Sequence, residues 1–116
     1  MNDADRRLHE MAAKAARYDV HWHHANQCFM INKGAIEQKW RPRDDDGDSF
    51  RLAAKLYLII TYDVPHSSWV SSGQRLGPFF NETIPIVDFR KQDEEVLAAT
   101  RRAVLRAAAY LGEINP

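Results

Sequence analysis

Three closely spaced histidines are the residues best suited to metal chemistry in this chain. They stand in the run H-W-H-H that begins at position 21. Alternate side chains of a strand share a face, so His21 and His23 would point the same way. With Cys28 across a predicted hairpin, or His66 from a later loop, they would offer zinc three ligands. The alternative is a set of exposed polar side chains, because no spaced second pair such as Cys-x-x-Cys follows. We therefore expect no cofactor, and zinc is the alternative.

Arginines recur on two predicted helices and could together bind an anion. The guanidinium fork suits phosphate, and a nearby tryptophan could stack on a base. The opposing interpretation is a solvated helix face, since a row of charges on a helix is usually exposed. A nucleotide-binding or phosphate-binding protein is thus the second hypothesis for function. Its candidate residues are Arg51, Arg101, Arg102 and Arg106.

The stretch 63–82 mixes turn residues with aromatic side chains and an arginine. A loop of this length in a small domain is often functional, and Trp, Phe and Arg are frequent anchors of interfaces. The alternative is a hairpin whose aromatic side chains pack beneath a sheet. We favour an interface with a protein partner, with nucleic acid or a nucleotide as the other possibility. The predicted anchors are Trp69, Arg75, Phe79 and Phe80.

Sequence motifs for catalysis and for calcium binding are missing. The chain has no G-x-S-x-G, no G-x-G-x-x-G and no phosphate-binding P-loop. Aspartates alternate from Asp44 to Asp48, but Ser49 and Lys55 stand where a calcium loop requires glycine and glutamate. We therefore expect a protein that is not an enzyme.

The composition sets the class of protein. A chain of 116 residues is long enough for one domain, spanning 1–116, with a core of its own. Sixteen basic and sixteen acidic side chains cancel, so no bulk field attracts nucleic acid or a membrane. A single cysteine excludes an intramolecular disulfide, no apolar run reaches the roughly 20 residues of a membrane span, and the first residues lack a secretory signal. We expect a cytoplasmic protein without a membrane contact.

The segment from Trp40 to Leu58 predicts the helix on which the other elements pack. Pro42 keeps the preceding backbone extended, and Asp44 or Asp45 can cap the helix that follows. Taken at 100° per residue, apolar side chains cover most of its circumference. We therefore expect this helix to be covered on more than one side and to be central.

The remaining patterns predict helices at both ends and strands between them. A helix over 2–17 is capped by Asn2 or Asp3, and alternating apolar residues predict a hairpin of 19–25 and 28–32. Strands follow the central helix, and Asp93 and Gly112 would begin and end the last helix. The expected fold is α+β, a small antiparallel sheet of three to five strands with three helices in the order α-β-β-α-β-β-α. Pro85 argues for an open edge strand, which makes a homo-oligomer possible.

Three motifs in order resemble those of a known group. They are M-A-A-K-A-A in the first helix, W-x-P-x-D-D-x-G-D-x-x-R-L-A-x-K-L from Trp40 to Leu56, and A-A-T-R-R-A-V-L-R-A-A-A from Ala98 to Ala109. The chain is similar in these motifs to a group of short uncharacterised proteins from bacteriophages and prophages of proteobacteria, whereas residues 62–92 carry no part of the likeness. The resemblance implies a phage-type accessory protein and carries over no catalytic residue. The first hypothesis for function is therefore binding of a host or viral macromolecule, for example to blunt a host defence.

Overall fold

The computed structural model describes residues 1–63 and 69–115 of the chain. Within these residues it contains three helices and two three-stranded antiparallel sheets, so the fold is α+β as predicted. The order is α-β-β-β-α-β-β-β-α, with one more strand on each side of the middle helix than the sequence indicated. In chain order the elements are α1 (Asp3–Ala16), β1 (Val20–His23), β2 (Cys28–Lys33), β3 (Ile36–Trp40), α2 (Asp46–Lys55), β4 (Ile59–Tyr62), β5 (Trp69–Gly73), β6 (Phe80–Thr83) and α3 (Phe89–Ile114).

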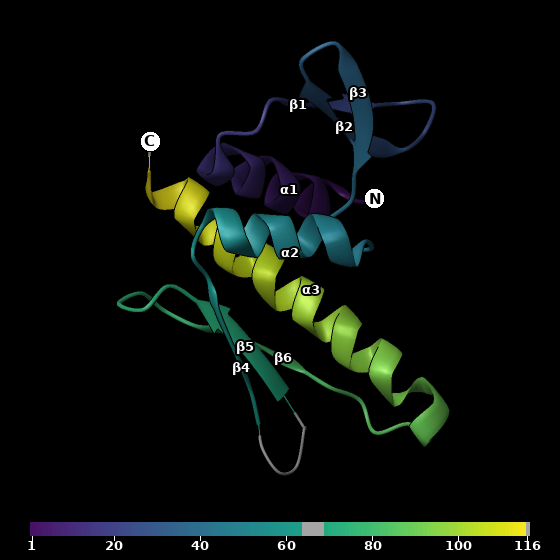
Figure 1. Ribbon diagram of the computed structural model, residues 1–116, viewed down its shortest axis with the longest axis vertical. Helices are drawn as coiled ribbons and strands as arrows, with labels where there is room; N and C mark the ends of the chain where they lie inside the picture. Colours follow the sequence, from purple (N-terminus) through teal and green to yellow (C-terminus); the bar gives the residue numbers. More distant parts are fainter. Residues whose placement is uncertain (64–68, 116) are drawn as a thin grey trace.

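The helices lie between the two sheets (Figure 1). The β1-β2-β3 sheet packs on α1 and α2, where Phe29 and Trp40 join Ala12 and Leu52 in one buried cluster. The β4-β5-β6 sheet packs on the other side of α3, where Val70 meets alanines of that helix. None of the helices among the described residues is both long enough and apolar enough to cross a membrane.

The central element is α3, and the prediction that α2 is central was wrong. The 26-residue α3 packs against α1, α2, β5 and β6. In contrast, α2 buries one side only: Leu52 is fully buried, whereas Phe50 is 73% exposed. The physical reason is length together with small side chains, since alanines along α3 let neighbouring elements approach it on several sides. Of the two predicted caps of α2, Asp45 is the one observed, because its carboxylate accepts the backbone N–H of Asp48 at 2.8 Å.

A close crossing joins α1 to the C-terminal part of α3. A Cβ atom placed on Gly112 would lie only 1.9 Å from the backbone carbonyl oxygen of Met11. The helix continues through Gly112 to Ile114, so the prediction that this glycine ends the helix was wrong. Gly112 is required because the backbone of α1 occupies the space of a side chain.

The cap of the last helix lies five residues before the predicted one. Asp88 is the N-cap, and its carboxylate accepts the backbone N–H of Arg90 at 2.9 Å. Asp93 therefore lies in the second turn rather than at the start. Acidic residues at 93–95 suggested a first turn, but an equally good capping side chain was present upstream.

The predicted loop over 63–82 is in large part a sheet. Trp69–Gly73 forms β5, the middle strand of the second sheet, and β6 follows after a turn. Of this stretch, residues 64–68, including the candidate ligand His66, lie outside the described residues. Val70 at 0% exposure explains why a strand forms here, since it packs under α3.

The register of the second sheet decides which side chains face α3. Tyr62 lies opposite Val70, and Ser72 lies opposite both Ile60 and Phe80. Because directly opposed residues share a face, all of these point towards α3 with the buried Val70. The residues between them in sequence, among them Thr61, point to the other face.

Candidate functional site

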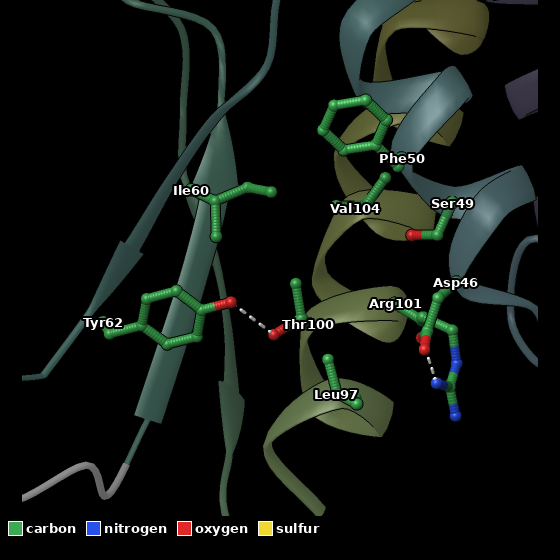
Figure 2. Close-up of a pocket in the computed structure, with 9 residues that line it drawn as sticks. All are labelled: Asp46, Ser49, Phe50, Ile60, Tyr62, Leu97, Thr100, Arg101 and Val104. Carbon is green, nitrogen blue, oxygen red and sulfur yellow. Dashed lines mark hydrogen bonds and ion pairs between the residues drawn. The ribbon is translucent and has the colours of Figure 1, made fainter. Parts of the chain in front are cut away.

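A cavity of about 240 Å³ opens between α2, α3 and β4. Figure 2 shows its side chains converging from these three elements. The residues that line it are Asp46, Ser49, Phe50, Ile60, Tyr62, Leu97, Thr100, Arg101 and Val104. Phe50 and Leu97 are 73% and 44% exposed, so large apolar side chains surround the opening. We refer to these nine residues as the α2–β4 groove.

The polar groups of the α2–β4 groove are bonded to one another. The Thr100 hydroxyl donates to the carbonyl oxygen of Val96 at 2.7 Å, so the Tyr62 hydroxyl is the donor in its 2.9 Å bond to Thr100. Arg101 forms an ion pair with Asp46 and donates from Nε to the carbonyl oxygen of Arg43 at 2.7 Å. An occupant of this groove would therefore meet apolar surface between satisfied polar pairs, which favours an apolar side chain.

The four arginines proposed for anion binding do not gather in one place. Arg51 pairs with Asp48 at 2.7 Å on α2, and Arg101 pairs with Asp46 in the α2–β4 groove. Asp48 also raises the pKa of Arg51, mainly through this hydrogen bond. Since each guanidinium faces a carboxylate of the chain, an anion at either place would have to displace it.

The other two arginines share one carboxylate on the second sheet. Arg102 and Arg106 lie 3.9 and 3.6 Å from the oxygens of Glu82, and Arg106 also donates to the carbonyl oxygen of Asn81 at 2.9 Å. The guanidinium of Arg106 stands over the ring of Phe80, 5.3 Å from its centroid. These arginines thus hold β6 to α3.

The four predicted partner-binding residues divide between the two faces of the second sheet. Phe80 faces α3, where its ring lies 5.6 Å from that of Tyr110. Trp69 and Phe79 stay 38% and 39% exposed, and Arg75 is exposed in the turn between β5 and β6. The structure therefore keeps Trp69, Arg75 and Phe79 accessible, whereas Phe80 is half-buried against α3.

Large apolar side chains lie on the face of the second sheet that points away from α3, with Trp69 near one end and with Ile59 and Phe79 beside Gly73 near the other. Trp69 and Ile59 alternate with residues that face α3, so they point outward. The ring of Phe79 lies against Gly73, where a Cβ would meet its Cδ1 at 3.1 Å. In the described part of the chain, the helices all lie on the other side of this sheet (Figure 1). We call Ile59, Trp69 and Phe79 the outer patch.

The candidate zinc ligands within the described residues do not gather into a set of three. The Nε2 atom of His21 lies 3.3 Å from a carboxylate oxygen of Glu37, and Nδ1 of His23 accepts the backbone N–H of Asn26 at 3.1 Å. Cys28 is buried opposite His23 in the hairpin. Within 1–63 and 69–115, no three His, Cys, Asp or Glu side chains come together as a metal site requires.

Sequence reasoning missed a buried histidine on α1. His9 is 1% exposed, stacked on Phe29 at 5.7 Å and edge-on to Trp40 at 6.1 Å between ring centroids. Its Nδ1 lies 2.6 Å from the carbonyl oxygen of Asp5, so this nitrogen carries the proton, and the buried Nε2 has no hydrogen-bond partner among the described residues. The spacing of His9 to Ala12, Ala13 and Ala16 marks the buried face and could have identified it.

The buried His9 predicts a stability that falls in acid. Burial lowers the pKa of His9 from its ordinary value of 6.5, and Arg43 lowers it further, against the opposing effects of Asp5 and Asp44. The unfolded chain therefore takes up this proton first, so stability is full above about pH 6.5 and is lost as the pH falls towards the lower folded-state pKa. Urea unfolding between about pH 5 and pH 8 should show this slope, and His9→Phe should reduce it.

A matched control for this measurement is His24→Gln, because His24 is exposed in the hairpin turn. That variant should keep the pH slope of the wild-type protein. An equal slope in the His9→Phe variant and the wild type would contradict the assignment to His9.

Comparisons of the chain with family models, with curated proteins and with solved structures give no match.

Proposed function

We propose that this chain is a non-enzymatic binding protein that recognises a host or viral macromolecule through the outer patch. The observation that carries the proposal is the exposure of Trp69 and Phe79 at 38% and 39% on a sheet face that no described helix covers. Aromatic side chains of this kind dominate the binding energy of many protein interfaces. The exposed Arg75 in the neighbouring turn would lie at the rim.

A protein is the partner that the charges favour. The net charge of the chain is zero. Arg101, Arg102 and Arg106 lie on α3, and each faces a carboxylate of the chain rather than the outer patch. A nucleic acid would call for a basic surface, because phosphate contacts supply much of its affinity. In keeping with the phage-type motifs, the protein partner would be one whose capture serves the virus, such as a component of a host defence.

A pull-down experiment tests the outer patch directly. Tagged wild-type protein and a Trp69→Ala, Phe79→Ala double variant would be incubated with a proteobacterial lysate, and the retained proteins identified by mass spectrometry. We expect at least one protein to be retained by the wild type and lost by the double variant, because truncating interface anchors commonly costs about 2 kcal/mol or more each.

The matched control removes two exposed apolar side chains elsewhere. Ile36 and Ile114 are 61% and 53% exposed on β3 and at the end of α3, so an Ile36→Ala, Ile114→Ala variant should retain the wild-type partners. Circular dichroism would establish that all three proteins are folded. The same retained proteins for all three would end the proposal for the outer patch.

A further inference from the structure

The outer edge of β4 is unpaired in the part of the chain that the structure describes. β4 is an edge strand in the order β4-β5-β6. The backbone N–H of Asp63 donates to Trp69 on β5 at 3.0 Å, so in the alternating ladder Thr61 and Ile59 also bond towards β5. The backbone groups of Ile60 and Tyr62 therefore point away from β5. A second extended strand could form hydrogen bonds with these groups through its own N–H and C=O groups.

β4 is short, with four residues, but it lacks the side chains that often protect an edge. Its sequence I-I-T-Y contains no charge and no proline, and its residues are β-branched or aromatic. The opposite edge is protected, because Arg106 donates to the carbonyl oxygen of Asn81 and Glu82 places a charge on β6. In the first sheet, β3 carries Glu37 and Lys39. Of the edge strands β3, β4 and β6, β4 is the one without a charged side chain.

The α2–β4 groove runs beside this open edge. Ile60 and Tyr62 form one wall of the groove, and Phe50 and Leu97 stand exposed across from them (Figure 2). A strand added next to β4 would point every second side chain into the same side of the sheet as Ile60 and Tyr62. Such side chains would cover Phe50 and Leu97. The volume of about 240 Å³ lies below the roughly 300–1,000 Å³ of small-molecule sites, so it suits side chains better than a metabolite.

We infer that β4 pairs antiparallel with β4 of a second copy of this chain, joining two three-stranded sheets into one. The strand is self-complementary, since a two-fold axis through Thr61 sets Ile60 opposite Tyr62 of the second copy and Tyr62 opposite Ile60. Both residues direct their backbone groups outward, so these are the hydrogen-bonded pairs. Thr61 then faces Thr61 of the second copy across the axis.

The same arrangement supplies an occupant for the groove. Tyr62 and Ile60 of the second copy extend from the paired strand over Phe50 and Leu97 of the first. The two-fold axis repeats this contact with the two copies exchanged, as an isologous interface requires. Four strand residues alone would bury less than the roughly 1,000 Å² of a specific interface, so these exposed side chains must contribute. Charge does not oppose the contact, because the net charge is zero and Arg101 is neutralised by Asp46. This inference concerns a different surface from the outer patch and stands independently of the proposed function.

Light scattering coupled to gel filtration, over a wide range of protein concentration, tests the pairing. The wild type should approach twice the 13.4 kDa of the single chain as concentration rises. Thr61→Lys should remain at the mass of one chain, because the two introduced charges would face each other across the axis and weaken the dimer by roughly tenfold or more. Thr61 is exposed, so the variant should fold normally by circular dichroism.

Thr83→Lys is the matched control. Thr83 is also an exposed threonine on an edge strand of the same sheet, but it lies on β6. This variant should dimerise like the wild type, and a mixture of Thr61→Lys with Thr61→Glu should recover the dimer. A monomeric wild type would overturn the inference and leave the edge to a strand of another protein or to none. Equal masses for all single variants would also overturn it.

Discussion

Replacing Gly112 with alanine should destabilise the protein by about 2–3 kcal/mol, one of the largest effects expected from so small a change. The added Cβ would lie 1.9 Å from the carbonyl oxygen of Met11 and 2.7 Å from its carbonyl carbon. Both are backbone atoms of α1, so relief requires the two helices to separate. The gain in helix propensity from glycine to alanine, about 1 kcal/mol, is too small to offset this loss. The free energy of unfolding in urea measures the effect.

Gly47→Ala is the helical control for this prediction. A Cβ there would meet flexible ends of Arg51 and Asp45 at 3.1–3.3 Å, which can move aside. The change in unfolding free energy should stay within about 1 kcal/mol, since propensity and crowding oppose each other. Equal effects of Gly112→Ala and Gly47→Ala would contradict the close crossing of α1 and α3.

The second large effect is expected at Leu52, which is fully buried in the cluster shared by α1, α2 and the first sheet. Leu52→Ala should cost about 2–5 kcal/mol, because the truncation removes apolar contacts and leaves a cavity in a packed core. The loss would appear as a lower urea midpoint with an unchanged slope.

Phe50→Ala, two residues away on the same helix, is the comparison that decides how α2 is covered. Phe50 is 73% exposed, so its truncation should change the unfolding free energy by less than about 0.5 kcal/mol. The measurement belongs at low protein concentration, where pairing of two copies contributes little. If both substitutions lowered the unfolding free energy by similar amounts, α2 would be covered on several sides, as the sequence predicted.

Local sequence signals were sufficient to predict the starts of α1 and α2. Asn2 was one of two predicted caps for the first helix, and its side chain accepts the backbone N–H of Asp5 at 2.8 Å. Asp45 caps α2 as one of two predicted residues. Capping depends on a side chain and an N–H group two or three residues apart, so the sequence contains the whole interaction. The helical class of both segments followed from the same local information.

Local signals failed where two segments competed for one role. Asp88 and Asp93 are both good caps, and acidic residues after Asp93 made the later start look better. The helix begins at Phe89. Gly112 was misinterpreted for a different reason. Glycine at the end of a helical pattern usually marks the C-terminus of the helix. Here the glycine is needed because the backbone of Met11, on another helix, lies against it.

The candidate functional residues also depend in part on contacts between segments that are distant in the sequence. Two of the expected anchors, Trp69 and Phe79, stay exposed, whereas a third, Phe80, packs beside Tyr110, thirty residues further along. The α2–β4 groove was not predicted at all, since its walls come from three elements that are separated in the chain. Its bond between Tyr62 and Thr100 spans 38 residues.

The sequence by itself determined the secondary structure class, two helix caps and the alternation of most strands, because periodicity and capping act over a few residues. The tertiary structure alone decided that α3 rather than α2 is central and that the strands divide into two sheets. It also decided that Arg101, Arg102 and Arg106 of α3 each meet a carboxylate of the chain. These outcomes depend on which faces meet. The faces that meet are determined by packing between distant segments, because a glycine or a row of alanines sets how closely two backbones approach.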